Sequence, residues 1–212
     1  MKTAELIEAL AASGTPVPAR PVMRQLVLSA LVGGAAAAVI VVFGLGLRPL
    51  DAAVQSRMFW MKAGYTLILA AAGWLVSGRL ARPGGVAGWA PALAAAGVLA
   101  MAVMGAMDLA HTSPTDLSRE WLGESWRLCP WYILGLAVPV YLALAVVMRR
   151  TAPTRLRTAG AAAGLFSGGV AGAIYGLHCP ESAAAFVATW YTLGIATSVA
   201  LGWLAGPRLL RW

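Results

Sequence analysis

Long uncharged apolar stretches alternate with short charged ones along the whole chain. A helix that crosses the hydrocarbon core needs about 20 apolar residues, because each residue rises about 1.5 Å. Six stretches satisfy this requirement, and the predicted spans are 26–47, 59–76, 86–107, 130–148, 158–177 and 183–204. The alternating pattern of a membrane β-barrel is not present in the sequence. The pattern predicts an all-α integral membrane protein with a tail at 1–25 and a six-helix transmembrane bundle at 26–212.

The charges agree with this prediction and give it an orientation. Only 11% of the residues are charged and 60% are hydrophobic, whereas soluble chains carry roughly 25% charged residues. With the N-terminus inside, 11 Lys and Arg residues fall on the cytoplasmic side and 5 on the other, as cytoplasmic loops retain positive charge. We therefore expect both termini in the cytoplasm. The net charge of +8 is explained by topology and requires no nucleic acid.

Several functional classes find little support in the sequence. Lys62 and Asp108 lie near span ends, from where we expect their side chains to reach the membrane interface. Ion pathways and pumps usually need ionisable groups inside the membrane, so such a transporter is disfavoured. The sequence contains no recognisable catalytic or nucleotide-binding motif. We expect neither enzymatic activity nor a resident cofactor.

Glycine recurs at every fourth position of the fifth predicted helix. Residues at this spacing share one helix face and let a neighbouring backbone approach closely. This pattern favours packing within the chain over a dimer interface. The residues are Gly160, Gly164, Gly168, Gly172 and Gly176.

Cys129 and Cys179 are the two cysteines of the chain, and each is followed by proline at the predicted outer face. Proline is favoured at the first helical position, which predicts that each cysteine lies at or beside the N-cap of a spanning helix. Three interpretations stay open: a structural disulfide, a reversible redox-responsive or metal-responsive pair, and two unrelated thiols. His111 and His178 could complete a Cys/His metal set with them, although the spacing is not that of a zinc finger.

The tail before the first span contains one short amphipathic stretch. Thr3 can cap a helix whose first turn contains Glu5, which the helix dipole favours. Leu6, Ile7 and Leu10 then fall on one face. A helix of this length is marginal alone in water, so we expect it to bind a partner protein, with a position on the inner leaflet as the alternative.

These features together resemble the NrsF-type membrane anti-sigma factors over nearly the whole chain. The resemblance rests on the opening KTAELI at 2–7, on six predicted helices, and on one Cys-Pro pair in each of two outer loops. It is strengthened by the WYxLG string at 190–194. Glu5 departs conservatively from the pattern, since the family often has Asp at this position.

The resemblance implies a regulator that holds an extracytoplasmic-function sigma factor at the bacterial inner membrane. It implies that Glu5, Leu6, Ile7 and Leu10 contact the sigma factor. It also implies that Cys129 and Cys179 sense heavy-metal or oxidative stress and trigger release. A small transporter or channel, or a structural subunit of a membrane complex, are the alternative functions.

Overall fold

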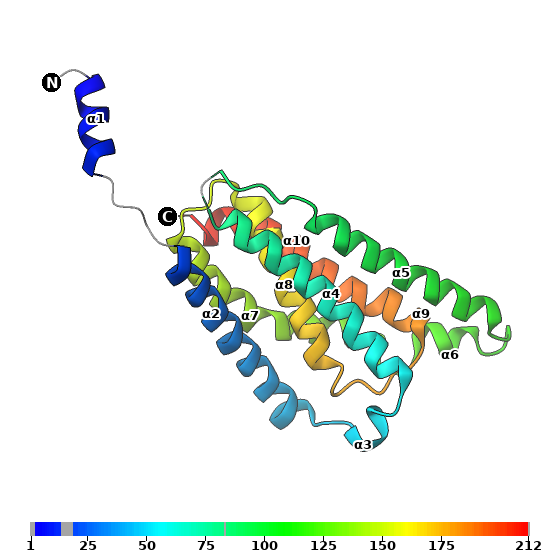
Figure 1. The fold of residues 1–212 in the computed structure, drawn as a ribbon. Coiled ribbons are helices and arrows are strands. Elements are labelled where there is room, and N and C mark those ends of the chain that lie inside the picture. The colour runs from blue at the N-terminus through cyan, green and yellow to red at the C-terminus, as the bar shows by residue number, and fades with distance from the viewer. Residues whose placement is uncertain (1–2, 14–18, 83, 212) are drawn as a thin grey trace.

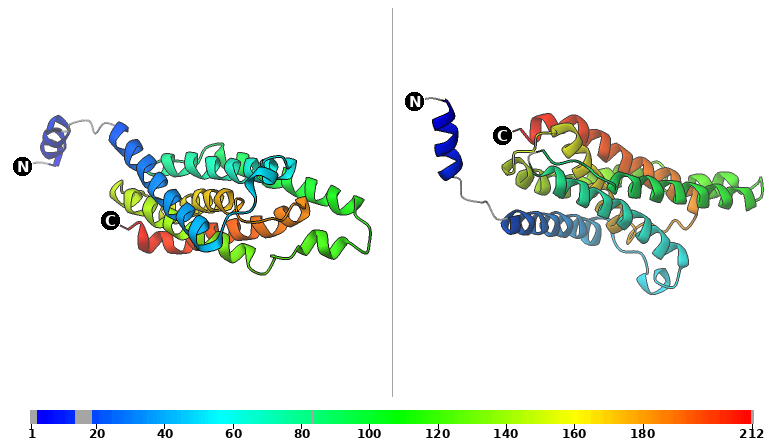
Figure 2. Two further views of the ribbon diagram at one scale, coloured as in Figure 1. Left: turned by 90° about the horizontal axis from the view of Figure 1, so that it is seen from below. Right: turned by 45° about the horizontal axis from the view of Figure 1, so that its top comes forward.

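The computed structural model describes residues 3–13, 19–82 and 84–211, and this part of the chain is helical with no strand. The elements are α1 (Thr3–Ser13), α2 (Ala19–Val39), η1 (Ile40–Leu45), α3 (Leu50–Ala53), α4 (Arg57–Leu80), α5 (Ala90–His111), α6 (Leu117–Leu122), α7 (Cys129–Arg150), α8 (Leu156–Tyr175), α9 (Ala184–Phe186), η2 (Val187–Tyr191) and α10 (Thr192–Leu209). The two η elements are π-helical. The long helices run side by side, and α1 stands apart from them at one end (Figures 1 and 2).

Among the described residues, five helical segments are long and apolar enough to cross a membrane. They are Val22–Leu45, Arg57–Leu80, Ala90–His111, Cys129–Arg150 and Ala184–Leu209. Each overlaps one of the spans predicted from the sequence. The remaining prediction, 158–177, overlaps α8, which is 20 residues long but is not among the five.

Helix α8 lies at the centre of the bundle, between α4 and α10, and also contacts α7 and α2. Twelve of its twenty residues are buried. The helix α2 packs on α7, while α5 packs against α4 and the start of the last helix. A central helix needs small side chains for such close neighbours, which explains its glycine-rich composition.

The predicted start of the third span at residue 86 is too early. Helix α5 begins at Ala90, because Gly84 and Gly88 both have left-handed φ angles, 73° and 66°, that a helix cannot contain. Arg79 fastens this turn by donating a hydrogen bond to the carbonyl oxygen of Ala87 at 2.9 Å. The turn thus returns the chain into the bundle beside α4.

Candidate functional site

Cys129 opens helix α7, as the sequence predicts. It is the first residue of that helix, and Pro130 follows in the first turn. Its amide donates a hydrogen bond to the carbonyl oxygen of Ser125 at 2.9 Å. The side chain is fully buried and its thiol is free.

Cys179 does not lie at a helix N-cap, so that prediction is wrong. It follows the end of α8, and its amide donates to the carbonyl oxygen of Tyr175 at 3.0 Å. The next helix begins only at Ala184. The carbonyl oxygens of Cys179 and Glu181 instead accept hydrogen bonds from Arg48 and Lys62, and these contacts hold the 176–183 segment out of a helix.

The two free cysteines belong to one buried cluster at this end of the bundle. Cys179, like Cys129, has no exposed surface, and the two side chains lie within electrostatic range of each other and of Lys62. They come from segments 50 residues apart in sequence that the fold brings to the same end of the molecule (Figure 1). The arrangement therefore gathers the chain's two thiols beside one buried cation.

The sequence suggested that Lys62 reaches the membrane interface, and this prediction is wrong. Its side chain is buried inside the protein, with 1% of its surface exposed. Its amino group donates to the carbonyl oxygen of Glu181 at 2.6 Å and to that of Cys179 at 3.4 Å. It also lies 3.8 Å from the sulfur of Cys179. Sequence reasoning missed this role because Lys62 lies near a span end, where a long side chain usually reaches water.

Aromatic rings surround this cluster. The ring of Tyr175 lies 5.7 Å from that of Tyr191 and 5.8 Å from that of Tyr132. His178 lies edge-on to Tyr132, with 6.4 Å between the ring centroids. Such packing excludes water and fixes the positions of the polar atoms inside it.

The histidines do not join the cysteines in a metal site. The ring of His178 makes a 2.8 Å hydrogen bond through Nδ1 to the carbonyl oxygen of Gly46. His111 ends α5 and lines a different hollow with Asp108 and four methionines. In the described part of the chain, no group of three or more His, Cys, Asp or Glu side chains could hold a metal ion.

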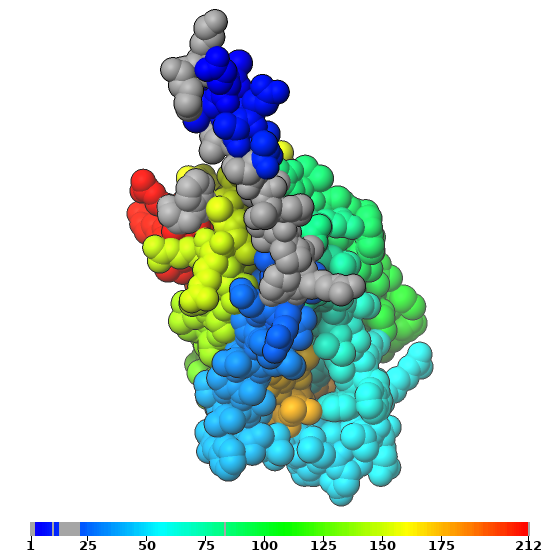
Figure 3. Space-filling view, turned by 60° about the vertical axis from the view of Figure 1, so that its left-hand side comes forward, coloured from blue at the N-terminus to red at the C-terminus, as the bar shows by residue number. Residues whose placement is uncertain are grey.

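The 176–183 segment is fastened to the first span. Arg48 follows that span, and its backbone N–H donates a hydrogen bond to the carbonyl oxygen of Leu177 at 3.1 Å. Its guanidinium donates to the carbonyl oxygen of Cys179 at 2.9 Å. Gold and orange atoms of the α8 region are visible between the blue surface of α2 and the cyan surface of α3 and α4 (Figure 3). A movement of the segment would therefore pull on the end of the first span.

Two acidic side chains also form hydrogen bonds that join this region to neighbouring segments. The carboxylate of Glu181 accepts hydrogen bonds from the amides of Glu124 and Ser125 at 2.9 and 3.1 Å. The carboxylate of Asp108 accepts from the amides of Ala184 and Ala185 at 2.9 and 3.4 Å, where α9 begins. Asp108 thus acts as a helix cap within the protein, whereas the sequence had suggested a side chain that reaches the interface.

The glycine ladder of α8 faces two helices of the same chain. A methyl group added at Gly160 would meet backbone atoms of Gly202 and Gly206, and one added at Gly164 would meet those of Ser198. At Gly168 it would lie 3.2 Å from the Cα of Ile195, all on α10. Further along the ladder, a methyl group added at Gly172 would lie 2.9 Å from the side chain of Thr66 on α4. One added at Gly176 would lie 3.7 Å from the aliphatic part of the Lys62 side chain. The ladder therefore lets α8 approach α10 first and then α4.

Helix α1 presents an apolar face outside the bundle. Leu6 is 43% exposed and Ile7 62% exposed, and Glu5 lies in the first turn. Leu10 belongs to the same helix, but its side chain lies outside the described residues. The face is available to a partner at the end of the molecule opposite the cysteines (Figure 1).

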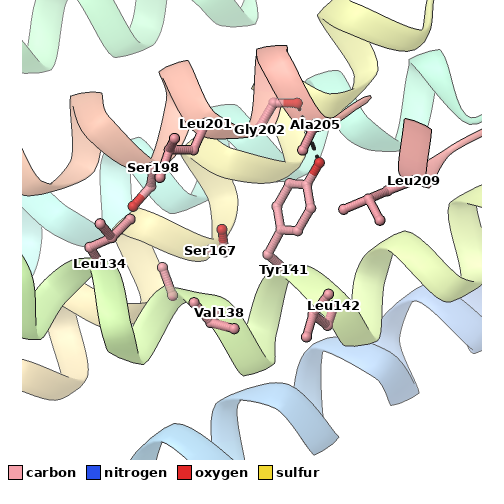
Figure 4. A pocket seen from close by; sticks show the side chains of 11 residues that line it. Leu134, Val138, Tyr141, Leu142, Ser167, Ser198, Leu201, Gly202, Ala205 and Leu209 are labelled. Carbon is pink, nitrogen blue, oxygen red and sulfur yellow. Dashed lines mark hydrogen bonds between the residues drawn. The ribbon is translucent and has the colours of Figure 1, made fainter. Parts of the chain in front are cut away.

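An apolar hollow between α7 and α10 offers no polar path through the bundle (Figure 4). Its polar side chains bond to backbone carbonyl oxygens: Tyr141 to Gly202 at 3.3 Å, Ser167 to Gly164 at 3.2 Å and Ser198 to Gly194 at 3.0 Å. The rest of its lining is aliphatic. The hollow suits lipid chains better than an aqueous solute.

Comparison with known proteins shows relatives along the full chain. A family model described as NrsF, negative regulator of sigma F, matches residues 10–212. The probable anti-sigma-F factor NrsF of Azospira oryzae is 40% identical over 213 residues, and the anti-sigma-F factor NrsF of Caulobacter vibrioides is 46% identical over 221 residues. Both matches cover 100% of this chain and of the relative. No solved structure gives a significant match.

The resemblance seen in the sequence is thus confirmed by independent comparisons. The tail residues at 5–7 precede the part that the family model matches but fall within the match to both relatives. This chain belongs to the NrsF family, the negative regulators of sigma F.

Proposed function

We propose that this protein holds an extracytoplasmic-function sigma factor at the bacterial inner membrane and releases it when Cys129 and Cys179 change state. One observation carries the proposal: a chain matched end to end by anti-sigma-F factors exposes an apolar helix at one end and buries two free thiols at the other. A regulator that reads one side of a membrane and acts on the other needs this division of parts.

The proposed topology has six spans with both termini in the cytoplasm. Helices α7 and α10 begin at the same end of the bundle, and α8 returns the chain between them (Figure 1), so α8 must cross if its neighbours do. Twelve of its twenty residues are buried among those neighbours. The 11 Lys and Arg residues predicted on the side of the tail, against 5 on the other side, support a cytoplasmic tail.

The sigma factor binds α1 in this proposal. Leu6 and Ile7 supply an exposed apolar face, which fits the mode in which an amphipathic helix occupies a groove of its partner. Glu5 and Leu10 are assigned to the same contact from the sequence. Because the isolated helix is marginal in water, binding and folding of the tail are coupled.

Oxidative or heavy-metal stress at the outer face is the proposed signal. In the oxidative case Cys129 and Cys179 join in a disulfide, and two protons and two electrons pass to an oxidant such as a peroxide, which is reduced to water. The bond displaces the 176–183 segment, which is fastened to the end of the first span through Arg48 and His178. Helix α2 then carries the displacement to the tail, and a tenfold loss of sigma affinity requires only about 1.4 kcal/mol.

Co-purification from native membranes tests the proposal. The full chain is solubilised from unstressed cells, and its bound proteins are identified by mass spectrometry. We expect a sigma factor with the native chain and none with Leu6→Asp/Ile7→Asp. The control, Ala12→Asp, adds a charge to the opposite face of α1 and should retain the sigma factor. Membrane partners without a sigma factor would instead favour a structural subunit.

The sensing part has its own test. Treatment of cells with hydrogen peroxide or cadmium should release the sigma factor from the native protein. It should leave the sigma factor bound to Cys129→Ser and to Cys179→Ser. Unchanged release from both variants would refute the sensor role of the cysteines and leave the anti-sigma role standing.

A further inference from the structure

Lys62 is a buried cation whose acceptors are all neutral. Its amino group has three N–H donors, and it contacts the carbonyl oxygens of Glu181 and Cys179 and the sulfur of Cys179. In the described part of the chain no carboxylate forms an ion pair with it. A buried charge is costly unless it is paired, so this site lacks one negative charge.

Tyr191 adds an unused donor to the same place. Its side chain is fully buried, and its hydroxyl group has no hydrogen-bond partner among the described residues. The hydroxyl group interacts electrostatically with Cys179, and the amino group of Lys62 lies 5.2 Å from the centre of the Tyr191 ring. Buried hydroxyl groups are rarely left unpaired, and exceptions need an explanation.

Two cations, Lys62 and Arg48, contact Cys179. Arg48 binds the carbonyl oxygen of Cys179. The carboxylate of Glu181 accepts hydrogen bonds from the amides of Glu124 and Ser125, and it interacts with Lys62 electrostatically without an ion pair among the described residues. Lys62 makes its sulfur contact with Cys179 and not with Cys129 among the described residues.

We propose that Lys62 and Tyr191 form a cradle for negative charge on the sulfur of Cys179, which makes Cys179 rather than Cys129 the first thiol to react. The cradle rests on the sensor role given above and specifies it. A thiolate is the reactive form of cysteine, and neighbouring cations favour it. Charge on this sulfur supplies the counter-ion that Lys62 lacks and an acceptor for the hydroxyl group of Tyr191. Both are positioning residues, because they act through Cys179.

Alkylation of the purified full-length protein by iodoacetamide measures this preference directly. The sulfur forms a bond to the reagent's carbon, the carbon–iodine bond breaks, iodide leaves, and the thiol proton passes to water. Both thiols are fully buried and need the outer end to open. The ratio of the two alkylation rates, measured by mass spectrometry on the same molecules, therefore largely removes the effect of opening.

In the native protein Cys179 should be alkylated faster than Cys129. Lys62→Met, which keeps the side chain's length without its charge, should lower the ratio of the Cys179 rate to the Cys129 rate about tenfold, and Lys62→Arg should largely restore it. Tyr191→Phe should lower the ratio by about threefold. It should also raise the melting temperature, because it removes an unpaired buried hydroxyl group.

Equal alkylation rates in the native protein, or an unchanged ratio in Lys62→Met and Tyr191→Phe, would overturn the cradle. Tyr191→Phe keeps the test decisive even if Lys62→Met fails to fold. The alkylation assay contains no sigma factor, so its result is independent of the co-purification. A predicted ratio without a sigma factor in the co-purification would preserve the cradle and refute the anti-sigma role.

Discussion

Replacing the glycines between α8 and α10 should separate these two helices. Gly160→Ala and Gly164→Ala each add one methyl group where two backbones meet. At Gly160 the new carbon would lie 2.8 Å from the Cα of Gly206, whereas ordinary contact begins at 3.4 Å. The oxygen of Gly202 would be closer still. The helices must therefore open by at least 0.6 Å at this point, the difference between 3.4 and 2.8 Å.

The cost follows from two opposing terms. Overpacking of a close contact typically costs about 1–3 kcal/mol, and neither helix can absorb the shift through a flexible side chain because the obstacles are backbone atoms. Alanine returns up to about 1 kcal/mol through its higher helix propensity. We expect a net loss of about 1–2 kcal/mol for each variant. The double variant should lose less than the sum, since one separation of the helices relieves both sites.

Thermal unfolding of the detergent-solubilised protein provides the assay. The matched control is Gly135→Ala on α7, where nothing lies within 4 Å of the added carbon, and this variant should be neutral or slightly stabilised. Melting temperatures for Gly160→Ala and Gly164→Ala that equal the control's would refute a tight α8–α10 contact. Fully additive losses would refute a shared separation.

Three further variants test the end of the bundle that holds the cysteines. Asp108→Ala removes the cap of α9 and should lower the free energy of unfolding by about 1 kcal/mol. Asp108→Asn should retain much of the capping contribution. A melting temperature of Asp108→Ala equal to the native value would contradict the capping role. Glu181→Ala removes the acceptor for Glu124 and Ser125, so iodoacetamide should reach both cysteines several-fold faster, and unchanged rates would show that this contact does not hold the segment closed. Arg48→Gln weakens the link between the first span and Cys179; under the proposed function it should raise sigma-dependent transcription in unstressed cells, and reporter activity at the native level would argue against transmission through α2.

The sequence predicts the long helices well because hydrophobic length alone determines them. It misplaces Cys179 because proline marks the first helical position only when the following turn is free to form. Here Arg48 and Lys62 take the carbonyl oxygens of the segment. These contacts join residues more than 110 positions apart, so no local pattern could reveal them.

Lys62 and Asp108 show the same limit for the candidate site. Both lie near span ends in the sequence, where long or charged side chains usually reach water. Whether a side chain turns outward or inward depends on the neighbouring helix, and here each finds backbone groups of the chain near Cys179 to bind. The two cysteines could be named from the sequence, whereas the cation and hydroxyl group beside them required the fold.

The two π-helical turns, η1 and η2, occur in the half of the bundle that holds the cysteines. η1 closes the first long helix and η2 lies near the start of the last. A π-helical turn accommodates an extra residue in less regular geometry and is often found at functional sites, and segments of this kind open locally at lower free energy than regular core helix. The two irregular turns therefore lie at the end of the bundle that, under the proposed function, receives the signal.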